Sequence, residues 1–145
     1  MAKKLLLSIV LAVFLSACKK DANDQIDYKT QIVGRWFFTG QQYNNYVNAK
    51  LTSQNDAPSS SIDKSSNIQF YADGKFTNGD SNNPAKEKGN YAIGRDSLYL
   101  ILDLDNSEVK FKIGKLTSTG LTIQRTNITG PNTALEIVNN YVLKP

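Results

Sequence analysis

The chain has 145 residues, 40% of them hydrophobic and 21% charged, which is enough for one domain with its own core and too little for two. Its 17 basic and 13 acidic residues alternate without a block of like charge, which argues against a nucleic-acid partner. It has no histidine and one cysteine, which argues against His-based or Cys-based nucleophilic catalysis and excludes an intramolecular disulfide.

The first residues have the organisation of a secretory signal peptide. Lys3 and Lys4 precede an apolar run from Leu5 to Phe14, and small residues follow that run. The run falls short of the roughly 20 apolar residues that a membrane-spanning helix needs. We therefore expect residues 1–17 to be a cleaved signal peptide rather than a transmembrane anchor.

The stretch Leu15-Ser16-Ala17-Cys18 resembles the lipobox of bacterial lipoproteins, which are cut before the cysteine and acylated on its thiol. Acylation would also remove the free reactive thiol that a single cysteine leaves in an exported protein. Two or more acyl chains hold a protein stably on a bilayer. The resemblance implies lipid attachment at Cys18 and a place in the cell envelope, anchored to the outer membrane, with the periplasmic or surface face left open.

The remaining chain favours strands over helices. Residues 18–30 are polar and read as a tether that ends in a short helical turn, and residues 31–145 are expected to form the folded domain. Asn, Ser, Thr and Gly are abundant, and the apolar residues lean towards Ile, Val, Leu, Tyr and Phe, a mixture typical of strands and turns.

The strands follow from alternation of apolar and polar residues. The clearest is Glu108–Lys115, in which Val109, Phe111 and Ile113 alternate with lysines. The stretch Thr52–Ser66 is predicted to be a long mobile loop. The predicted strands in chain order are Ile32–Phe38, a weaker candidate at Tyr43–Leu51, Ile68–Ala72, Lys75–Thr77, Gly89–Ile93, Ser97–Leu102, Glu108–Lys115, Leu121–Arg125 and Leu135–Leu143.

Eight or nine short strands joined mostly by tight turns predict an all-β fold. A sandwich and a barrel are both compatible with this spacing. Consecutive hairpins favour an antiparallel up-and-down barrel of about eight strands, and closure would also remove exposed strand edges.

Four motifs in this order resemble the lipocalin-like lipoproteins of Bacteroidetes. The motifs are Gly34-Arg35-Trp36, Phe70-Tyr71-Ala72-Asp73-Gly74-Lys75-Phe76, Gly89-Asn90-Tyr91 and Leu98-Tyr99-Leu100. The resemblance implies a lipocalin-like barrel in which Gly34 and Trp36 form a structural motif at one end. Classical lipocalins pack an arginine near the last strand across this tryptophan. Here Arg125, one strand earlier, is the candidate for that stacking contact.

Two binding modes are compatible with such a barrel, because eight strands enclose an interior that side chains fill or that holds one small ligand. In the first mode a small apolar or amphipathic molecule binds in the barrel, lined by inward-facing residues: Phe70, Phe76, Tyr91, Leu100, Phe111 and Ile123. In the second the barrel is solid and the chain contacts a glycan or protein through its loops. Tyr43 and Tyr46, among several amide side chains, suit that role.

No catalytic, metal or cofactor site is expected. The acidic residues that could form a carboxylate pair, Asp96, Asp103, Asp105 and Glu108, fall at predicted turns, where acids are common. The segment Asp103–Asn106 is too short for a calcium-binding loop. We therefore expect a monomeric, non-catalytic binding protein whose partners are the membrane, through its lipid, and a small hydrophobic ligand.

The lipid anchor is tested by Cys18→Ala. We expect mass spectrometry of the mature unchanged protein to show acyl mass on a chain that begins at Cys18, and this variant to carry no acyl mass. A mature chain of the unchanged protein without acyl mass would contradict the lipoprotein assignment.

Overall fold

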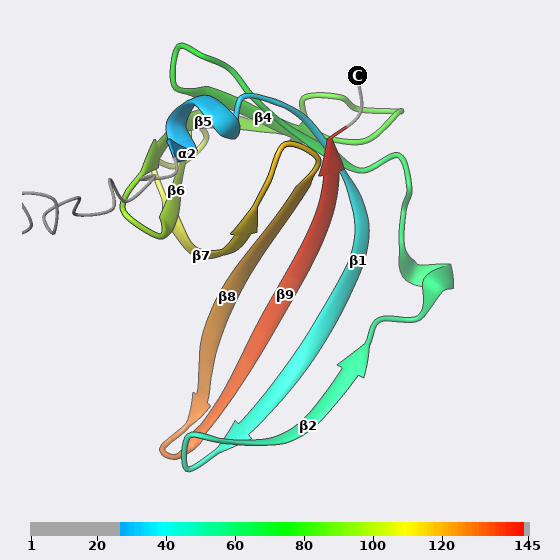
Figure 1. Ribbon diagram of the computed structural model, residues 1–145, viewed down its shortest axis with the longest axis vertical. Coiled ribbons are helices and arrows are strands. Elements are labelled where there is room, and N and C mark those ends of the chain that lie inside the picture. The colour runs from blue at the N-terminus through cyan, green and yellow to red at the C-terminus, as the bar shows by residue number, and fades with distance from the viewer. Residues whose placement is uncertain (1–26, 144–145) are drawn as a thin grey trace, which may run out of the picture.

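The computed structural model describes residues 27–143 (Figure 1). Within this range the chain forms one short helix, α2 (Tyr28–Gln31), one 3₁₀ turn, η1 (Ser59–Ser61), and nine strands. The strands are β1 (Gly34–Val47), β2 (Lys50–Asp56), β3 (Asn67–Phe70), β4 (Lys75–Gly79), β5 (Glu87–Ile93), β6 (Ser97–Leu102), β7 (Glu108–Leu116), β8 (Gly120–Gly130) and β9 (Thr133–Leu143).

Eight of these strands close into an antiparallel barrel, as predicted. β3 to β9 pair in sequence order, β1 pairs with β3, and β9 returns to pair with β1. The ninth strand, β2, lies outside the ring and pairs with β1 alone. The fold class is therefore an all-β closed barrel with one additional strand.

The strand β1 is long because it serves two parts of the fold. Its first residues, Gly34–Phe37, pair with β3, and its last residues, Gln42–Val47, pair with β2. β8 pairs with β7 only as far as Gln124 and continues beyond it beside β9. The far halves of β8, β9 and β1 therefore leave the barrel together with β2 as a four-stranded sheet, here called the protruding sheet (Figure 1).

Two sequence-based expectations are wrong in this region. Tyr43–Leu51 is not a separate strand, since β1 runs through to Val47, and Thr52–Asp56 is strand β2 rather than loop. Asn48 and Ala49 form the connecting two-residue turn with φ values of 51° and 60°. Two-residue hairpin turns are usually recognised in a sequence by the dipeptide Asn-Gly. This hairpin was not predicted because alanine occupies the second position of its turn. The loop is confined to residues 57–66.

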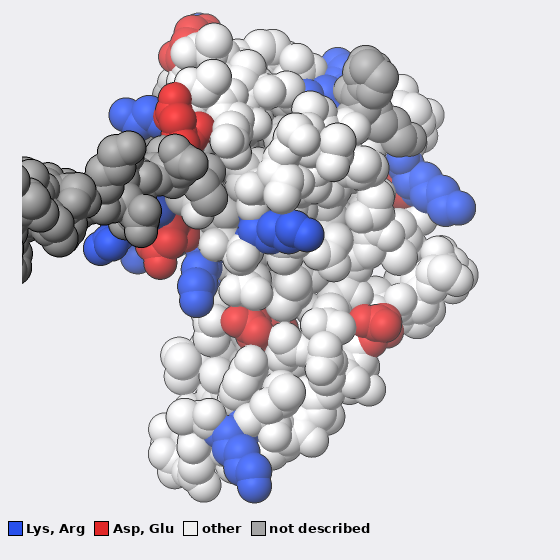
Figure 2. All heavy atoms as spheres, viewed as in Figure 1, with Lys and Arg blue, Asp and Glu red and all other residues white. Residues whose placement is uncertain are grey.

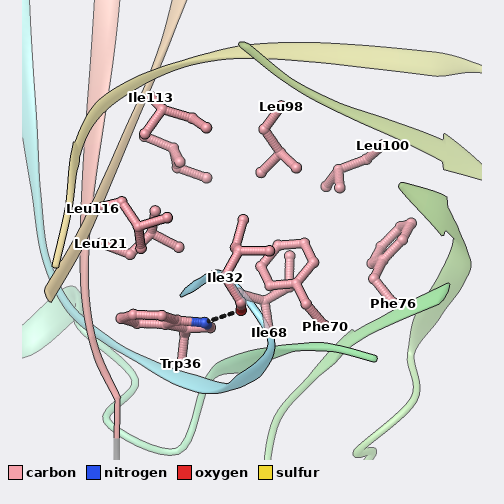
Figure 3. Packing of buried hydrophobic residues seen from close by; sticks show 11 residues of the cluster. Ile32, Trp36, Ile68, Phe70, Phe76, Leu98, Leu100, Ile113, Leu116 and Leu121 are labelled. Carbon is pink, nitrogen blue, oxygen red and sulfur yellow. Dashed lines mark hydrogen bonds between the residues drawn. The ribbon is translucent and has the colours of Figure 1, made fainter. Parts of the chain in front are cut away.

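The core lies inside the barrel and consists of apolar side chains that are 0–7% exposed (Figure 3). Trp36 is wholly buried, and its indole N–H donates a hydrogen bond to the carbonyl of Ile32 at 2.7 Å. The buried cluster comprises Ile32, Trp36, Ile68, Phe70, Phe76, Leu98, Leu100, Ile113, Leu116, Leu121 and Ile123.

Helix α2 brings Ile32 to this cluster. The Asp27 side chain caps the helix by accepting hydrogen bonds from the backbone N–H groups of Lys29 and Thr30, at 3.2 and 3.4 Å. Ile32 follows the helix and is 0% exposed, and Tyr28 packs against the same cluster. The short helical turn expected at the end of the tether is therefore present and packs against the core.

Gly34 has a physical reason to precede Trp36 by two residues. Its φ of 142° is one that side chains with a Cβ rarely adopt. A Cβ there would also lie 2.6 Å from the Cδ1 atom of Leu143 on β9. The glycine thus lets β1 approach the last strand where the barrel closes.

Residues 1–26, with Cys18, lie outside the described residues. The signal peptide, the lipid attachment and most of the tether therefore stay predictions. From Asp27 to Leu143, the structure contains no helix of the length and apolarity that crossing a bilayer requires.

Gly89 and Gly40 form a matched test of barrel packing. A Cβ at Gly89 would lie 1.9 Å from the Ile101 carbonyl oxygen, whereas a Cβ at Gly40 would meet nothing within 4 Å. We expect Gly89→Ala to lower the free energy of unfolding by about 1–3 kcal/mol, through overpacking. Gly40→Ala should change it by no more than about 0.5 kcal/mol. Urea unfolding followed by Trp36 fluorescence measures both, and equal effects would contradict the packing described here.

Candidate functional site at the barrel mouth

The inward surface of the barrel continues onto one face of the protruding sheet. Side chains two residues apart on a strand share a face. On β8, Leu121 and Ile123 are 1% and 2% exposed inside the barrel, so Arg125 follows them on the same face. On β9, Tyr141 lies opposite Leu121. Asn139 lies opposite Ile123. We call this continuous surface the inner face.

Strand β1 supplies Phe38, Gln41 and Tyr43 to the inner face, because a bulge between Phe38 and Gly40 shifts the register. Along this face the side chains change from buried and apolar to half-buried and polar. We call the residues at this change the barrel mouth: Phe38, Gln41, Tyr43, Arg125, Ile137, Asn139 and Tyr141.

A chain of hydrogen bonds orders the amides of the mouth. The Tyr43 hydroxyl donates to Gln41 Oε1 at 2.5 Å. Gln41 Nε2 in turn donates to Asn139 Oδ1 at 2.8 Å. All three side chains are half-buried. These bonds fix the orientation of the Gln41 and Asn139 amide groups. The Nδ2 donors of Asn139 have no acceptor among the described residues.

Tyr141 lies deeper than these amides. Its ring packs against the Phe38 ring with centroids 5.6 Å apart and planes tilted by 59°. Burial raises the pKa of the Tyr141 phenol to about 12. No hydrogen bond joins its hydroxyl to another residue between Asp27 and Leu143. The phenol is therefore a neutral donor inside the mouth with its hydrogen-bonding capacity unused.

Arg125 does not stack on Trp36, contrary to the sequence-based expectation. Arg125 and Tyr43 both lie opposite Ile137, whereas Trp36 lies opposite Leu143. Tyr43 is seven residues from Trp36 along β1, or about 20 Å at the rise of a strand. Arg125 is exposed and has no ion-pair partner within the described part of the chain. The cation–π contact that the structure does show places Lys110 over Tyr99, 5.4 Å from its centroid.

The six residues expected to line a ligand lie mostly below the mouth. Phe70, Phe76, Leu100 and Ile123 belong to the buried cluster, with exposures of 1–7%. Phe111 and Tyr91 are half-buried and pack against that cluster. Tyr91 makes an edge-on contact with the Phe70 ring and donates its hydroxyl proton to the Tyr71 carbonyl. Contact of any of the six with a ligand stays a prediction.

Four mouth residues were not singled out from the sequence as site residues: Phe38, Ile137, Asn139 and Tyr141. A usable signal existed, because Leu135, Ile137, Asn139, Tyr141 and Leu143 alternate along the last strand. An asparagine on an otherwise apolar face marks the point where that face leaves the core.

Of the acidic residues considered for catalysis, Asp96, Asp103 and Asp105 lie between strands as expected, whereas Glu108 is the first residue of β7. Hydrogen bonds from the Ser107 side chain and backbone lower the pKa of the Asp105 carboxyl. Within residues 27–143, no three His, Cys, Asp or Glu side chains gather as a metal site would require.

Fold and mouth together define a closed antiparallel barrel whose inner surface extends beyond its rim. No family model matches the chain, and no curated protein matches it. Among solved structures, it is similar to a lipocalin-like protein from Bacteroides uniformis, with 15% identity and a TM-score of 0.44. The match covers 74% of this chain and 96% of that one. A likeness of this degree carries no functional argument.

The Tyr141 phenol makes stability depend on alkaline pH. An unfolded tyrosine ionises near pH 10, whereas folded Tyr141 holds its proton up to about pH 12. Between these values the unfolded state loses a proton that the folded state keeps, so the free energy of unfolding falls as pH rises, by about 3 kcal/mol.

Tyr141→Phe removes this ionisation and keeps the aromatic ring. Urea unfolding at pH 8 and pH 11 should show a smaller alkaline loss of stability in the variant than in the unchanged protein. Other groups titrate alike in both proteins, so parallel losses would contradict the assigned burial of the phenol.

Proposed function

We propose that this protein is a membrane-anchored, non-catalytic binding protein that takes a small amphipathic ligand at the barrel mouth. One observation carries the proposal. On a single face, the unpartnered phenol of Tyr141 and the unpaired guanidinium of Arg125 flank a half-buried surface of rings and amides.

The inner end of this surface suits the apolar part of the ligand. The rings of Phe38 and Tyr141 and the side chain of Ile137 present carbon surface that the described residues only half cover. Each methylene group buried there contributes about 0.8 kcal/mol to binding. The buried cluster beneath closes the site from below, so the ligand would rest on the core rather than enter it.

The outer end suits an anionic group. Arginine presents planar, bidentate donors that match a carboxylate or a phosphate. Arg125 is exposed on the inner face, and Lys50 lies opposite Val47 farther out on that face. The inner face of the protruding sheet carries no acidic side chain among the described residues. An anion would therefore meet a positive field there and no repulsion.

The proposed lipid anchor would hold this site close to a bilayer. About nine residues separate Cys18 from Asp27, a span of about 30 Å at full extension. That reach would keep Asp27 within about one bilayer thickness of the membrane surface, and the mouth lies about 20 Å farther along β1.

A second binding mode is favoured by a different observation. The large side chains of the buried cluster occupy the barrel interior with exposures of 0–7%, as a solid barrel requires. The protein would then be an interaction module that contacts a glycan or protein through its loops. Such a module would not retain a free anionic amphiphile, so one titration separates the two modes.

The titration uses the full chain with Cys18→Ala, which keeps its own acyl chains out of the measurement. A dansylated fatty acid should bind saturably and quench Trp36, the single tryptophan. Arg125→Gln should weaken binding about tenfold, the loss expected for one charge-assisted hydrogen bond. An uncharged alcohol analogue should be unaffected by that substitution.

Arg35→Gln is the matched control, because Arg35 is exposed on the same barrel and bonds Gln69 outside the mouth. It should bind the probe as the unchanged protein does. Absence of saturable binding, or equal losses in both variants, would contradict the proposed function.

A further inference from the structure

The opposite face of the protruding sheet, here called the outer face, carries a second group of polar side chains. Asn44 on β1 lies opposite Gln54 on β2 and Glu136 on β9, and Glu136 lies opposite Thr126 on β8. These four residues form one row across the sheet. Asn44 stands in its centre and is only 8% exposed.

The adjacent row, nearer the end of the sheet, is apolar apart from one hydroxyl. Tyr46 lies opposite Leu51 and Ala134, and Ala134 lies opposite Ile128. Leu51 is 45% exposed and Ile128 is 78% exposed. The outer face therefore sets carbon surface directly beside the polar row.

Two donors converge on one oxygen of Glu136. Asn44 Nδ2 donates to Oε2 at 2.9 Å, and the Tyr46 hydroxyl donates to the same oxygen at 3.2 Å. Burial and the neighbouring carboxylate raise the pKa of the Tyr46 phenol, which keeps its proton on this bond. The other carboxylate oxygen, Oε1, accepts no hydrogen bond from a residue that the structure describes.

The side-chain oxygen of Asn44 is also unused. Oδ1 is buried and has no hydrogen-bond partner. The amide cannot be reversed to relieve this, because its oxygen would then face the Glu136 carboxylate in place of the donating NH₂. A buried acceptor without a donor costs free energy, which a ligand with an N–H group would recover.

Glu136 makes no ion pair with a residue that the structure describes. The acidic residues on the outer face are Glu136 and Asp56, and Gln42 bonds the latter at 3.0 Å. The outer-face positions of β1, β2, β8 and β9 contain no lysine or arginine, and the next basic residue across the register is Lys112 on β7, opposite Gln124. In Figure 2, acidic side chains lie over the middle of the protruding sheet, with basic side chains above them and near the lower end of the sheet.

We propose that this group of residues is a binding site for a primary ammonium group, carried by a small alkylamine or by a lysine side chain. The ammonium presents three N–H donors. Glu136 Oε1 and the Tyr46 hydroxyl oxygen supply two acceptors with unused capacity, and Asn44 Oδ1, which is buried, becomes the third when the ammonium displaces the side chains over it. The alkyl stem of the amine would lie on the apolar row.

Other ligand classes fit these residues less well. A calcium ion takes six to eight oxygens with several carboxylates, whereas this row offers one carboxylate. A neutral sugar would donate to the same acceptors but leave the charge of Glu136 uncompensated. Only a cationic donor supplies both hydrogen bonds for the two unused oxygens and a positive charge for the carboxylate of Glu136.

The test follows the side-chain amide signal of Asn44 by NMR in the full chain with Cys18→Ala. Titration with n-butylammonium should shift this signal saturably, whereas n-butanol and sodium chloride should not. An extended lysine peptide and its Nε-acetylated form make the second arm. Tighter binding of the unacetylated peptide than of butylammonium would assign the site to a protein lysine, and the reverse to a small amine.

Glu136→Gln should weaken ammonium binding at least tenfold. Asp56→Asn is the matched control, because it removes the same charge from the adjacent row of the same face, on the side nearer the barrel, and it should alter affinity less than twofold. Asn44→Ala gives a second reading that leaves the Glu136 charge in place, since it removes the unused oxygen and should weaken binding severalfold.

Equal response to butanol and butylammonium would overturn the proposal. So would undiminished binding by Glu136→Gln, equal weakening by Asp56→Asn, or unchanged affinity of Asn44→Ala. The anionic probe of the inner face is unaffected by these residues, so the two proposals fail separately.

Discussion

The pairing of the first strand with the last is the constraint on which the rest of this structure depends. β1 and β9 are bonded from Trp36–Leu143 to Val47–Thr133, over the full length of β9 and all of β1 except Gly34 and Arg35. The first half of this ladder closes the barrel around Trp36. Its second half extends beyond the barrel rim and carries β2 and the end of β8 with it. The barrel and the protruding sheet are thus two ends of one ladder.

The same ladder separates two kinds of chemistry by the alternation of a strand. Neighbouring residues on β9 face opposite ways, so Ile137 joins the barrel mouth while Glu136 joins the outer face. One face holds Arg125 and the unpartnered phenol of Tyr141, and the other holds a carboxylate and the unpartnered oxygen of Asn44. A register shift of one residue would exchange them. The bulge after Phe38 therefore matters for both surfaces.

The sequence predicted the parts of this fold that are encoded locally. The alternation in Glu108–Lys115 and the Asp73-Gly74 turn gave the hairpins of the barrel, and the motif around Trp36 gave its buried end. The outer half of β1 and the strand β2 were not predictable in this way. Both are polar and their turn is Asn48-Ala49, so the pairing of β1 with a strand ninety residues away is needed to make this part regular. The mouth and the outer face depend on that register, which explains why Arg125 was assigned the wrong neighbour.

The contact between Ile32 and Trp36 gives the barrel a defined point of attachment. The described chain enters the barrel through α2 and then reaches Ile32, which lies in the buried cluster with Trp36. The indole N–H of Trp36 donates a hydrogen bond to the carbonyl of Ile32. Tension on the preceding segment would reach this contact first and then pass into β1. Because the start of β1 is bonded to β3 on one side and β9 on the other, two ladders share that tension. The strand that closes the barrel is thus also the one suited to resist being pulled from it.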